Sequence, residues 1–259
     1  MRGVFGDQVL LLARRSVIRT ARQPANVVFP LVFPLLLLAV NAGGLDSATR
    51  LPGFPTDSFL AFALAIPFIQ GALFATMNTG TDLARDIQTG FLNRLALTPM
   101  RGVALLAGQL GGSLTLGVIQ ALVYLGVGLV VGVRFASGPL GVLVLLAFAI
   151  LVSVGFAALG AFAALRTGSG EAVQGLFPLF FVFLFLSSMN MPRNLIEIDW
   201  FRYVATANPV SYLIECVRSL IITGWDGEAL ALGFGIATAI MLVGVTLASV
   251  SLGTRLARS

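Results

Sequence analysis

Six long apolar segments restrict what this chain can fold into. They lie at about 26–44, 57–80, 103–133, 139–165, 171–190 and 228–253. About 20 apolar residues are enough for an α-helix to cross the ~30 Å hydrocarbon layer of a membrane. Strands of a transmembrane β-barrel would be about 10 residues long and would alternate apolar with polar side chains. We therefore predict an all-α integral membrane protein with six transmembrane helices.

The composition agrees with a location in the membrane. Only 10% of the 259 residues are charged and 58% are hydrophobic, whereas soluble domains carry about 25% charged residues. So few polar groups could not cover the surface of a soluble globule. The sequence shows no second domain and no low-complexity linker, so we predict a single membrane domain over residues 1–259.

Missing residue types exclude several kinds of chemistry. The chain has no histidine, and all 16 of its basic residues are arginine. A P-loop needs a lysine, and the common catalytic triads and zinc helices need histidine. The single Cys216 excludes an internal disulfide and a Cys-x-x-Cys site. We therefore predict no catalytic residue and no metal site. Because the arginines are dispersed, nucleic acid is not an expected partner either.

The distribution of arginine predicts the orientation. With the N-terminus in the cytoplasm, five of the 16 arginines face the outside and the other eleven face the inside, as the positive-inside rule requires. The outside set is Arg50, Arg134, Arg193, Arg202 and Arg218. Both termini are therefore predicted to be cytoplasmic. The arginine-only basic set, together with abundant Ala, Gly and Val, favours a bacterial inner membrane.

Residues 1–25 are predicted to form an amphipathic helix at the membrane interface. Small apolar residues recur at every fourth position and arginines gather on the other side, as in helices that lie in the headgroup layer. The apolar set is Val9, Ala13, Val17 and Ala21, and the basic set is Arg14, Arg15, Arg19 and Arg22. Leu11, Leu12 and Ile18 blur this division, and Pro24 ends the helix.

The stretch 81–101, which is predicted to be cytoplasmic, is too polar to span a membrane. Its apolar residues are also spaced too regularly for an irregular loop. Ile87, Phe91 and Leu95 are spaced four residues apart, which predicts one helix with an apolar ridge. Two interpretations remain open: a loop helix that rests on the membrane, or a helix that docks on a cytoplasmic partner.

The outer segment 191–227 contains a helix that is too short to cross the membrane. Residues 211–222 form an apolar run of 12 that carries Glu215 and Arg218, three positions apart and therefore able to pair on one helix face. We expect a re-entrant or interfacial helical hairpin, although an ordinary extracellular loop helix fits nearly as well.

Two motifs in these segments resemble a known family. One is Arg85-Asp86-x-x-x-Gly90-Phe91-x-x-Arg94-Leu95-x-x-x-Pro99, and the other is Asn208-Pro209-Val210-Ser211-Tyr212 followed by Arg218 and Gly224. With the six segments and the amphipathic N-terminus, the chain resembles a membrane (permease) subunit of the type-2 ABC exporter family, in the drug-resistance, lipid and polysaccharide export branch. Asp86 departs from the pattern, because many relatives have glutamate there.

The resemblance implies a non-catalytic transport subunit. Two copies of this chain, or this chain and a close relative, would bind two cytoplasmic ATPase subunits, which bind ATP and Mg; this chain itself would hold no cofactor. The substrate would be a drug-like or lipid amphiphile. Export of a lipid-linked polysaccharide, or transport as a secondary carrier without an ATPase, are the alternatives.

The resemblance also assigns roles to residues. The coupling helix that docks on the ATPase would use Arg85, Asp86, Ile87, Gly90, Phe91, Arg94, Leu95 and Pro99. The outer gate would use Asn208, Pro209, Tyr212, Glu215 and Arg218. The substrate path between the two copies would be lined by Phe62, Gln70, Phe74, Asn78, Phe177, Phe180 and Phe181.

Overall fold

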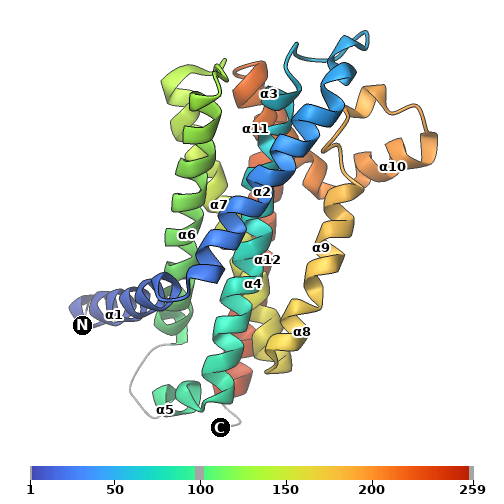
Figure 1. Ribbon diagram of the computed structural model, residues 1–259. Helices are drawn as coiled ribbons and strands as arrows, with labels where there is room; N and C mark the ends of the chain where they lie inside the picture. The colour runs from blue at the N-terminus through green and yellow to red at the C-terminus, as the bar shows by residue number, and fades with distance from the viewer. Residues whose placement is uncertain (1, 97–101, 257–259) are drawn as a thin grey trace.

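The computed structural model describes residues 2–96 and 102–256, and every element found there is helical. The helices are α1 (Arg2–Ala21), α2 (Pro24–Leu45), α3 (Phe59–Ala63), α4 (Ala65–Gln88), α5 (Phe91–Ala96), α6 (Gly102–Val130), α7 (Gly138–Thr167), α8 (Gly170–Gln174), α9 (Leu176–Phe185), α10 (Asp199–Ala207), α11 (Pro209–Ile222) and α12 (Gly227–Leu256), with 3-10 turns η1 (Asp46–Arg50) and η2 (Arg193–Leu195). Figure 1 shows an elongated bundle with α5 at one end and α3, α10 and α11 towards the other.

Five stretches of helix in the described residues are long and apolar enough to cross a membrane. They are Asn26–Arg50, Phe59–Gln88, Ala104–Val130, Gly138–Thr167 and Gly227–Leu256. These stretches match five of the six predicted segments. The chain is therefore a multi-pass membrane protein, as its composition indicates.

The remaining predicted segment, 171–190, is not among these five stretches, so a sixth span stays a prediction. This segment consists of α8 and α9, which are separated at Gly175, and α9 ends at Phe185. Pro178 lacks the N–H that would bond the carbonyl of Gln174, and its ring crowds that carbonyl, so the helix is interrupted here. At ~1.5 Å per residue, positions 170–185 rise about 24 Å, less than the ~30 Å of a hydrocarbon layer. Figure 1 shows α8 and α9 along the flank of the bundle.

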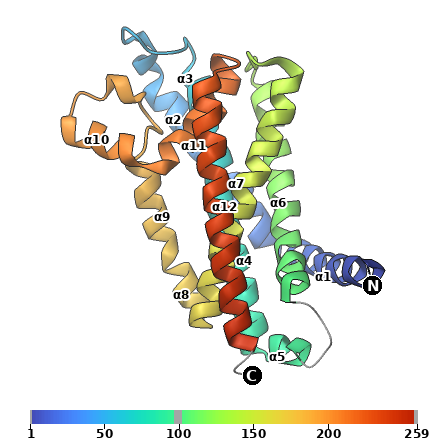
Figure 2. The same ribbon diagram turned by 180° about the vertical axis from the view of Figure 1, so that it is seen from behind.

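Helix α4 is the central element. It packs against α7, and α7 packs in turn against α12 (Figure 2). Where α4 crosses α7 the backbones nearly touch: a Cβ on Gly160 would lie 2.0 Å from the carbonyl oxygen of Thr76. The Thr76 hydroxyl also donates to the Phe156 carbonyl at 2.9 Å. Small residues permit such close approach, and hydrogen bonds add to it inside a membrane.

Two prolines shape α2. Pro30 and Pro34 lie inside the helix, and each lacks the N–H that would bond the carbonyl four residues earlier. Those two carbonyls find donors on neighbouring helices. The amide of Asn78 on α4 donates to the Asn26 carbonyl at 3.2 Å, and the hydroxyl of Tyr124 on α6 donates to the Pro30 carbonyl at 2.6 Å. The prolines therefore tie α2 to α4 and α6.

Helix α1 crosses the base of the bundle and projects away from it (Figures 1 and 2). It packs on α6, where Cβ atoms added to Gly108 and Gly112 would collide with Leu12 and Ser16. The helix itself is confirmed by the structure. Its position at a membrane surface stays a prediction.

The outer segment folds into η2, α10 and α11. The Asn208 side chain caps α11 by accepting a hydrogen bond from the Val210 N–H at 2.9 Å, and its amide donates to the Phe183 carbonyl at the end of α9. Pro209 occupies the first turn of α11, where its missing N–H costs nothing. A re-entrant position in a membrane stays a prediction.

Candidate functional site

An ionic cluster joins α1 to the end of α4. Arg15 and Arg19 lie four residues apart on α1, and Asp82 and Asp86 lie four residues apart on α4. Like charges at this spacing repel each other on a helix. Here each pair neutralises the other: Arg15 binds both oxygens of Asp86 at 2.9 and 3.0 Å, while Arg19 reaches Asp86 at 2.9 Å and Asp82 at 3.2 Å. We call these four residues the coupling cluster.

The carboxylate of Asp86 has no acceptor capacity left for a partner protein. Its two oxygens take four hydrogen bonds, two from Arg15, one from Arg19 and one from the amide of Gln109 on α6 at 2.9 Å. The residue is 4% exposed. The hydrogen bonds from Arg15 in turn raise the pKa of that guanidinium. Arg15 and Arg19 of α1 therefore already occupy the Asp86 carboxylate in this structure, and a docking role for Asp86 stays a prediction.

The predicted ridge of Ile87, Phe91 and Leu95 is interrupted. Helix α4 ends at Gln88, and Gly90 has a φ of +68°, a left-handed conformation that glycine adopts readily at helix ends. Ile87 therefore belongs to α4, where it packs on a buried apolar cluster, and Phe91 begins α5. The continuous helix predicted over 81–101 is wrong at Gly90.

The remaining coupling-helix residues lie around α5. Phe91 is half-buried beneath Arg15, whose guanidinium carbon lies 3.8 Å from the ring centroid. Arg85 and Arg94 are exposed. Leu95 lies in α5 with its side chain outside the described part, and Pro99 lies outside the described residues. Phe91 thus connects α5 to the coupling cluster.

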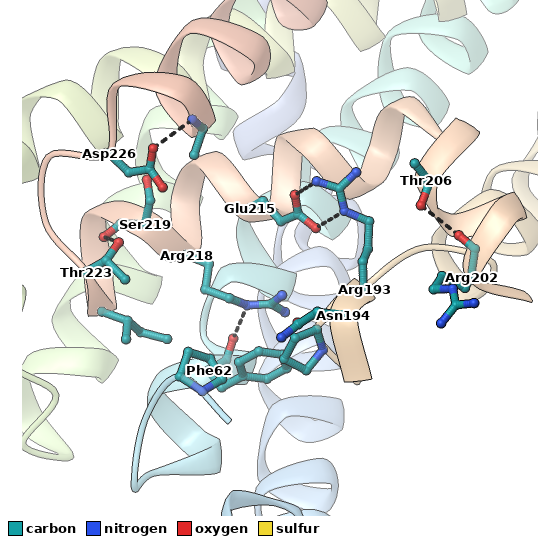
Figure 3. A pocket seen from close by; sticks show the side chains of 14 residues that line it. Phe62, Arg193, Asn194, Arg202, Thr206, Glu215, Arg218, Ser219, Thr223 and Asp226 are labelled. Atoms are coloured by element: carbon teal, nitrogen blue, oxygen red, sulfur yellow. Dashed lines mark hydrogen bonds and ion pairs between the residues drawn. The ribbon is translucent and has the colours of Figure 1, made fainter. Parts of the chain in front are cut away.

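A second cluster lies at the other end of the bundle, where Glu215 was expected to pair with Arg218. Glu215 instead binds Arg193, which follows α9 in the chain, with contacts of 2.6 and 2.8 Å, and also accepts a hydrogen bond from Ser188 at 2.9 Å. Arg193 also lies over the ring of Tyr212, 4.5 Å from its centroid. The predicted Glu215–Arg218 pair is therefore wrong, because the carboxylate of Glu215 is bound to Arg193 instead (Figure 3).

Arg218 binds backbone rather than acid. Its guanidinium donates to the carbonyls of Phe62 at 3.3 Å, Ser188 at 3.1 Å and Met189 at 3.0 Å, and lies 3.5 Å from the centroid of the Phe62 ring. These carbonyls belong to the end of α3 and to the turn after α9, where helical partners are missing. Arg218 therefore holds three segments together. We call Arg193, Glu215, Arg218 and Ser188 the outer cluster.

A cavity of about 550 Å³ lies beside the outer cluster (Figure 3). Its walls combine Arg193 and Glu215 with apolar groups such as Phe62 and Ile222. Nearby, the Tyr212 hydroxyl donates to the Thr206 carbonyl and so ties α11 to α10. The structure thus brings together Tyr212, Glu215 and Arg218, while Asn208 and Pro209 serve as the start of α11.

The residues expected to line a substrate path fall into separate groups. Phe74, Phe177 and Phe181 meet in one aromatic cluster with Phe29 and Phe33 of α2, with centroid separations from 4.6 to 6.2 Å. Phe180 instead contacts Phe156 of α7, and Phe62 lies under Arg218. The aromatic cluster spans α2, α4 and α9, so it remains the part of the set that fits a path.

The two polar members of that set differ. Asn78 bonds the carbonyl left open by Pro30 and so has a structural partner. Gln70 is 0% exposed, and neither atom of its amide is hydrogen-bonded in the described part of the chain. An unbonded buried amide is costly, so Gln70 differs from Asn78 in having no polar partner among the described residues, and its place in a substrate path stays a prediction.

Several residues were missed by reasoning from the sequence. Arg15, Arg19 and Asp82 carried a signal, namely two matched pairs at a spacing of four. Arg193 and Ser188 carried none, because their partners lie more than 20 positions away. Among the described residues, no three His, Cys, Asp or Glu side chains come together as a metal site requires.

Comparison with known proteins identifies the family of this chain. Residues 7–222 match the family described as ABC-2 type transporter. A daunorubicin resistance ABC transporter permease protein of Streptomyces coeruleorubidus is 32% identical over 201 residues, which is 75% of this chain and 66% of that protein, slightly under two thirds of its length. A probable doxorubicin resistance ABC transporter permease protein of Mycobacterium tuberculosis is 26% identical over 221 residues, 85% of this chain and 79% of that protein.

A more distant relative has the same broad description. A putative transport permease of Cyanophora paradoxa is 23% identical over 218 residues, 83% of this chain and 74% of that protein. The family match covers most of the chain, and the apolar helices and the helical fold are consistent with it. The chain therefore belongs to the ABC-2 type transporter family of membrane proteins.

Proposed function

We propose that this chain is the permease subunit of an ATP-driven exporter that moves a hydrophobic or amphipathic compound, drug-like or lipid, outward across a bacterial inner membrane. The names of the Streptomyces and Mycobacterium relatives support a drug-like substrate. The absence of lysine supports a separate ATPase, since this chain cannot form a P-loop. Two ATPase subunits would bind ATP and Mg, and two permease chains would enclose the path.

The coupling cluster carries this proposal. Through Arg15 it connects α1, the cytoplasmic end of α4 and, by way of Phe91, α5. An ATPase that moved α5 or α1 would therefore pull on α4, the most deeply packed of the spanning helices. Motion of α4 would displace Phe74, and with it the aromatic cluster shared with α2 and α9. The coupling cluster is thus a mechanical junction, not a docking surface.

The test uses inside-out membrane vesicles that contain the native complex. We expect ATP, but not a non-hydrolysable analogue, to drive accumulation of doxorubicin, followed by its fluorescence. A tagged chain purified in mild detergent is expected to retain an ATP-binding partner. Uptake that continues without ATP, from a chain that purifies alone, would overturn the proposal in favour of a secondary carrier.

The Phe91→Ala variant tests whether the contact between Phe91 and Arg15 is needed for transport, as distinct from a general effect of removing an aromatic ring. The ring supports Arg15 at the base of the bundle, so its removal is expected to reduce uptake and retention of the ATPase together. Phe183→Ala removes an exposed ring near the end of α9 that has no ring contact among the described residues, and serves as the matched control. Equal loss in both variants would count against a junction at Phe91.

A further inference from the structure

Helix α1 carries a groove that the coupling cluster does not account for. The groove has a volume of about 780 Å³, and the described residues that line it belong to α1 and the turn that follows it. Its principal lining residues are Leu11, Arg14, Arg15, Ile18, Arg19 and Arg22. Four of the chain's 16 basic residues therefore line a single cavity. We call this cavity the arginine groove.

The charge of the groove is only partly compensated. Arg15 and Arg19 direct their guanidinium groups to Asp86 and Asp82. Arg14 and Arg22 are exposed, and neither forms an ion pair with any residue in 2–96 or 102–256. The groove is thus left with two positive charges in excess, at the edge of a network whose own charges cancel.

The same groove presents apolar side chains to its surroundings. Leu11 is 64% exposed and Ile18 is 40% exposed, and both lie among the arginines on one side of α1. The opposite side of the helix, with Leu12, Ala13 and Ser16, is packed on α6. Exposed leucine and isoleucine beside arginine are typical of helices that lie in the headgroup layer.

The position of α1 agrees with that environment. Helix α2 begins at Pro24, directly after the groove, and its spanning stretch starts at Asn26. Figure 1 shows α1 meeting the start of α2 and extending sideways out of the bundle. The groove therefore lies at the level at which the first spanning helix enters the membrane.

We propose that the arginine groove binds the headgroup of an anionic phospholipid. Arginine forms bidentate hydrogen bonds with phosphate, so Arg14 and Arg22 would bind the headgroup. Leu11 and Ile18 would lie beside the first carbons of the acyl chains. A headgroup held there would fix α1 next to the coupling cluster, because Arg14 directly precedes Arg15 in the chain. The proposal does not depend on which compound is exported.

The purified full-length chain in detergent provides the test, with bound lipid measured by native mass spectrometry in an equal mixture of phosphatidylglycerol and phosphatidylcholine. We expect retained phosphatidylglycerol to exceed phosphatidylcholine about tenfold, since each arginine near an anionic surface contributes noticeably to binding. The R14Q/R22Q double variant should lose that preference. The R85Q/R94Q double variant, which removes the same charge from exposed positions near α5, should keep it.

Other occupants give different results. If inorganic phosphate at equal concentration displaces the phosphatidylglycerol, the groove is a simple anion site and the lipid proposal fails. If R14Q/R22Q retains its lipid preference but loses a co-purified ATPase, the groove docks a protein and the proposal also fails. Arg14 and Arg22 make no ion pair, so we expect the double variant to fold, which a melting curve identical to that of the parent would verify.

Discussion

Both ionic clusters of this molecule contain an arginine–carboxylate pair, but Arg15 of the coupling cluster and Arg218 of the outer cluster use their guanidinium groups in opposite ways. In the coupling cluster, Arg15 and Arg19 bind carboxylates on another helix, and Arg15 remains 37% exposed. In the outer cluster, Arg218 is buried and binds three carbonyls and a ring. An ion pair between two helices can break and form again, because water can hydrate the separated charges. A buried guanidinium that donates hydrogen bonds to backbone carbonyls of two other segments cannot be replaced by water in this way.

This contrast assigns different roles to the two ends. Asp86 is buried, but its partner Arg15 is 37% exposed, and ion pairs that water can reach are suited to contacts that change. Removal of one partner from a buried charged hydrogen-bond network costs much more, because the remaining groups lose their partners. We therefore expect the coupling cluster to control transport and Arg218 to control folding.

Arg218→Ala should have the largest effect. It leaves three buried carbonyls without a donor and removes the contact with the Phe62 ring, so we expect a loss of more than about 3 kcal/mol in the free energy of unfolding. Thermal unfolding in detergent measures this loss. Arg202→Ala, at an exposed arginine of α10, should change little. If Arg218→Ala melts like the parent but no longer transports, Arg218 acts as a gate and not as a clamp.

Asp86→Ala should have an intermediate effect, larger on transport than on stability. It frees Arg15 and Arg19 together, and a double-mutant cycle with Arg15→Ala should give a coupling energy of about 1–3 kcal/mol. Doxorubicin uptake should fall while the protein still folds. Arg134→Ala, at an exposed arginine far along the chain, is the control. Additive effects of Asp86→Ala and Arg15→Ala would show that the pair is not coupled.

Tyr124→Phe should have the smallest effect. It removes a buried hydrogen-bond donor that, unlike the guanidinium of Arg218, carries no charge. Like Arg218, the Tyr124 hydroxyl completes a carbonyl that has no helical partner, here that of Pro30. Its loss should cost about 1 kcal/mol in the free energy of unfolding. Tyr203→Phe removes a hydroxyl from a side chain that is 77% exposed and should cost nothing measurable. Equal melting temperatures for both variants would mean that the Pro30 carbonyl needs no donor.

Much of the fold could be predicted because it depends on local sequence. Five of the predicted segments form helices that are long and apolar enough to span a membrane, because these two properties depend on local sequence. The break between α8 and α9 is also local in origin, because Pro178 cannot donate to the Gln174 carbonyl, and apolar composition alone does not reveal it. Gly90 is a similar case, because the spacing of Ile87 and Phe91 predicted a helix that the glycine ends.

The sites were harder to predict, because their residues are distant in the chain. Asp86 was recognised as part of a motif, but its partner Arg15 lies 71 positions away. Arg218 was recognised in the same way, and was assigned to Glu215 because the two share a helix face. In the folded chain Glu215 binds Arg193 instead. Arg218 donates to the backbone carbonyls of Phe62, Ser188 and Met189.

Composition and the order of apolar and polar residues therefore determine that this chain is helical, belongs in a membrane and has no lysine for a P-loop. These properties depend on composition and on runs of residues, which the chain carries wherever it folds. The choice of partner for each arginine and each open carbonyl was decided only by packing. Proline and helix ends create acceptors whose locations can be read from the sequence, but the donor that reaches them depends on which helices lie side by side.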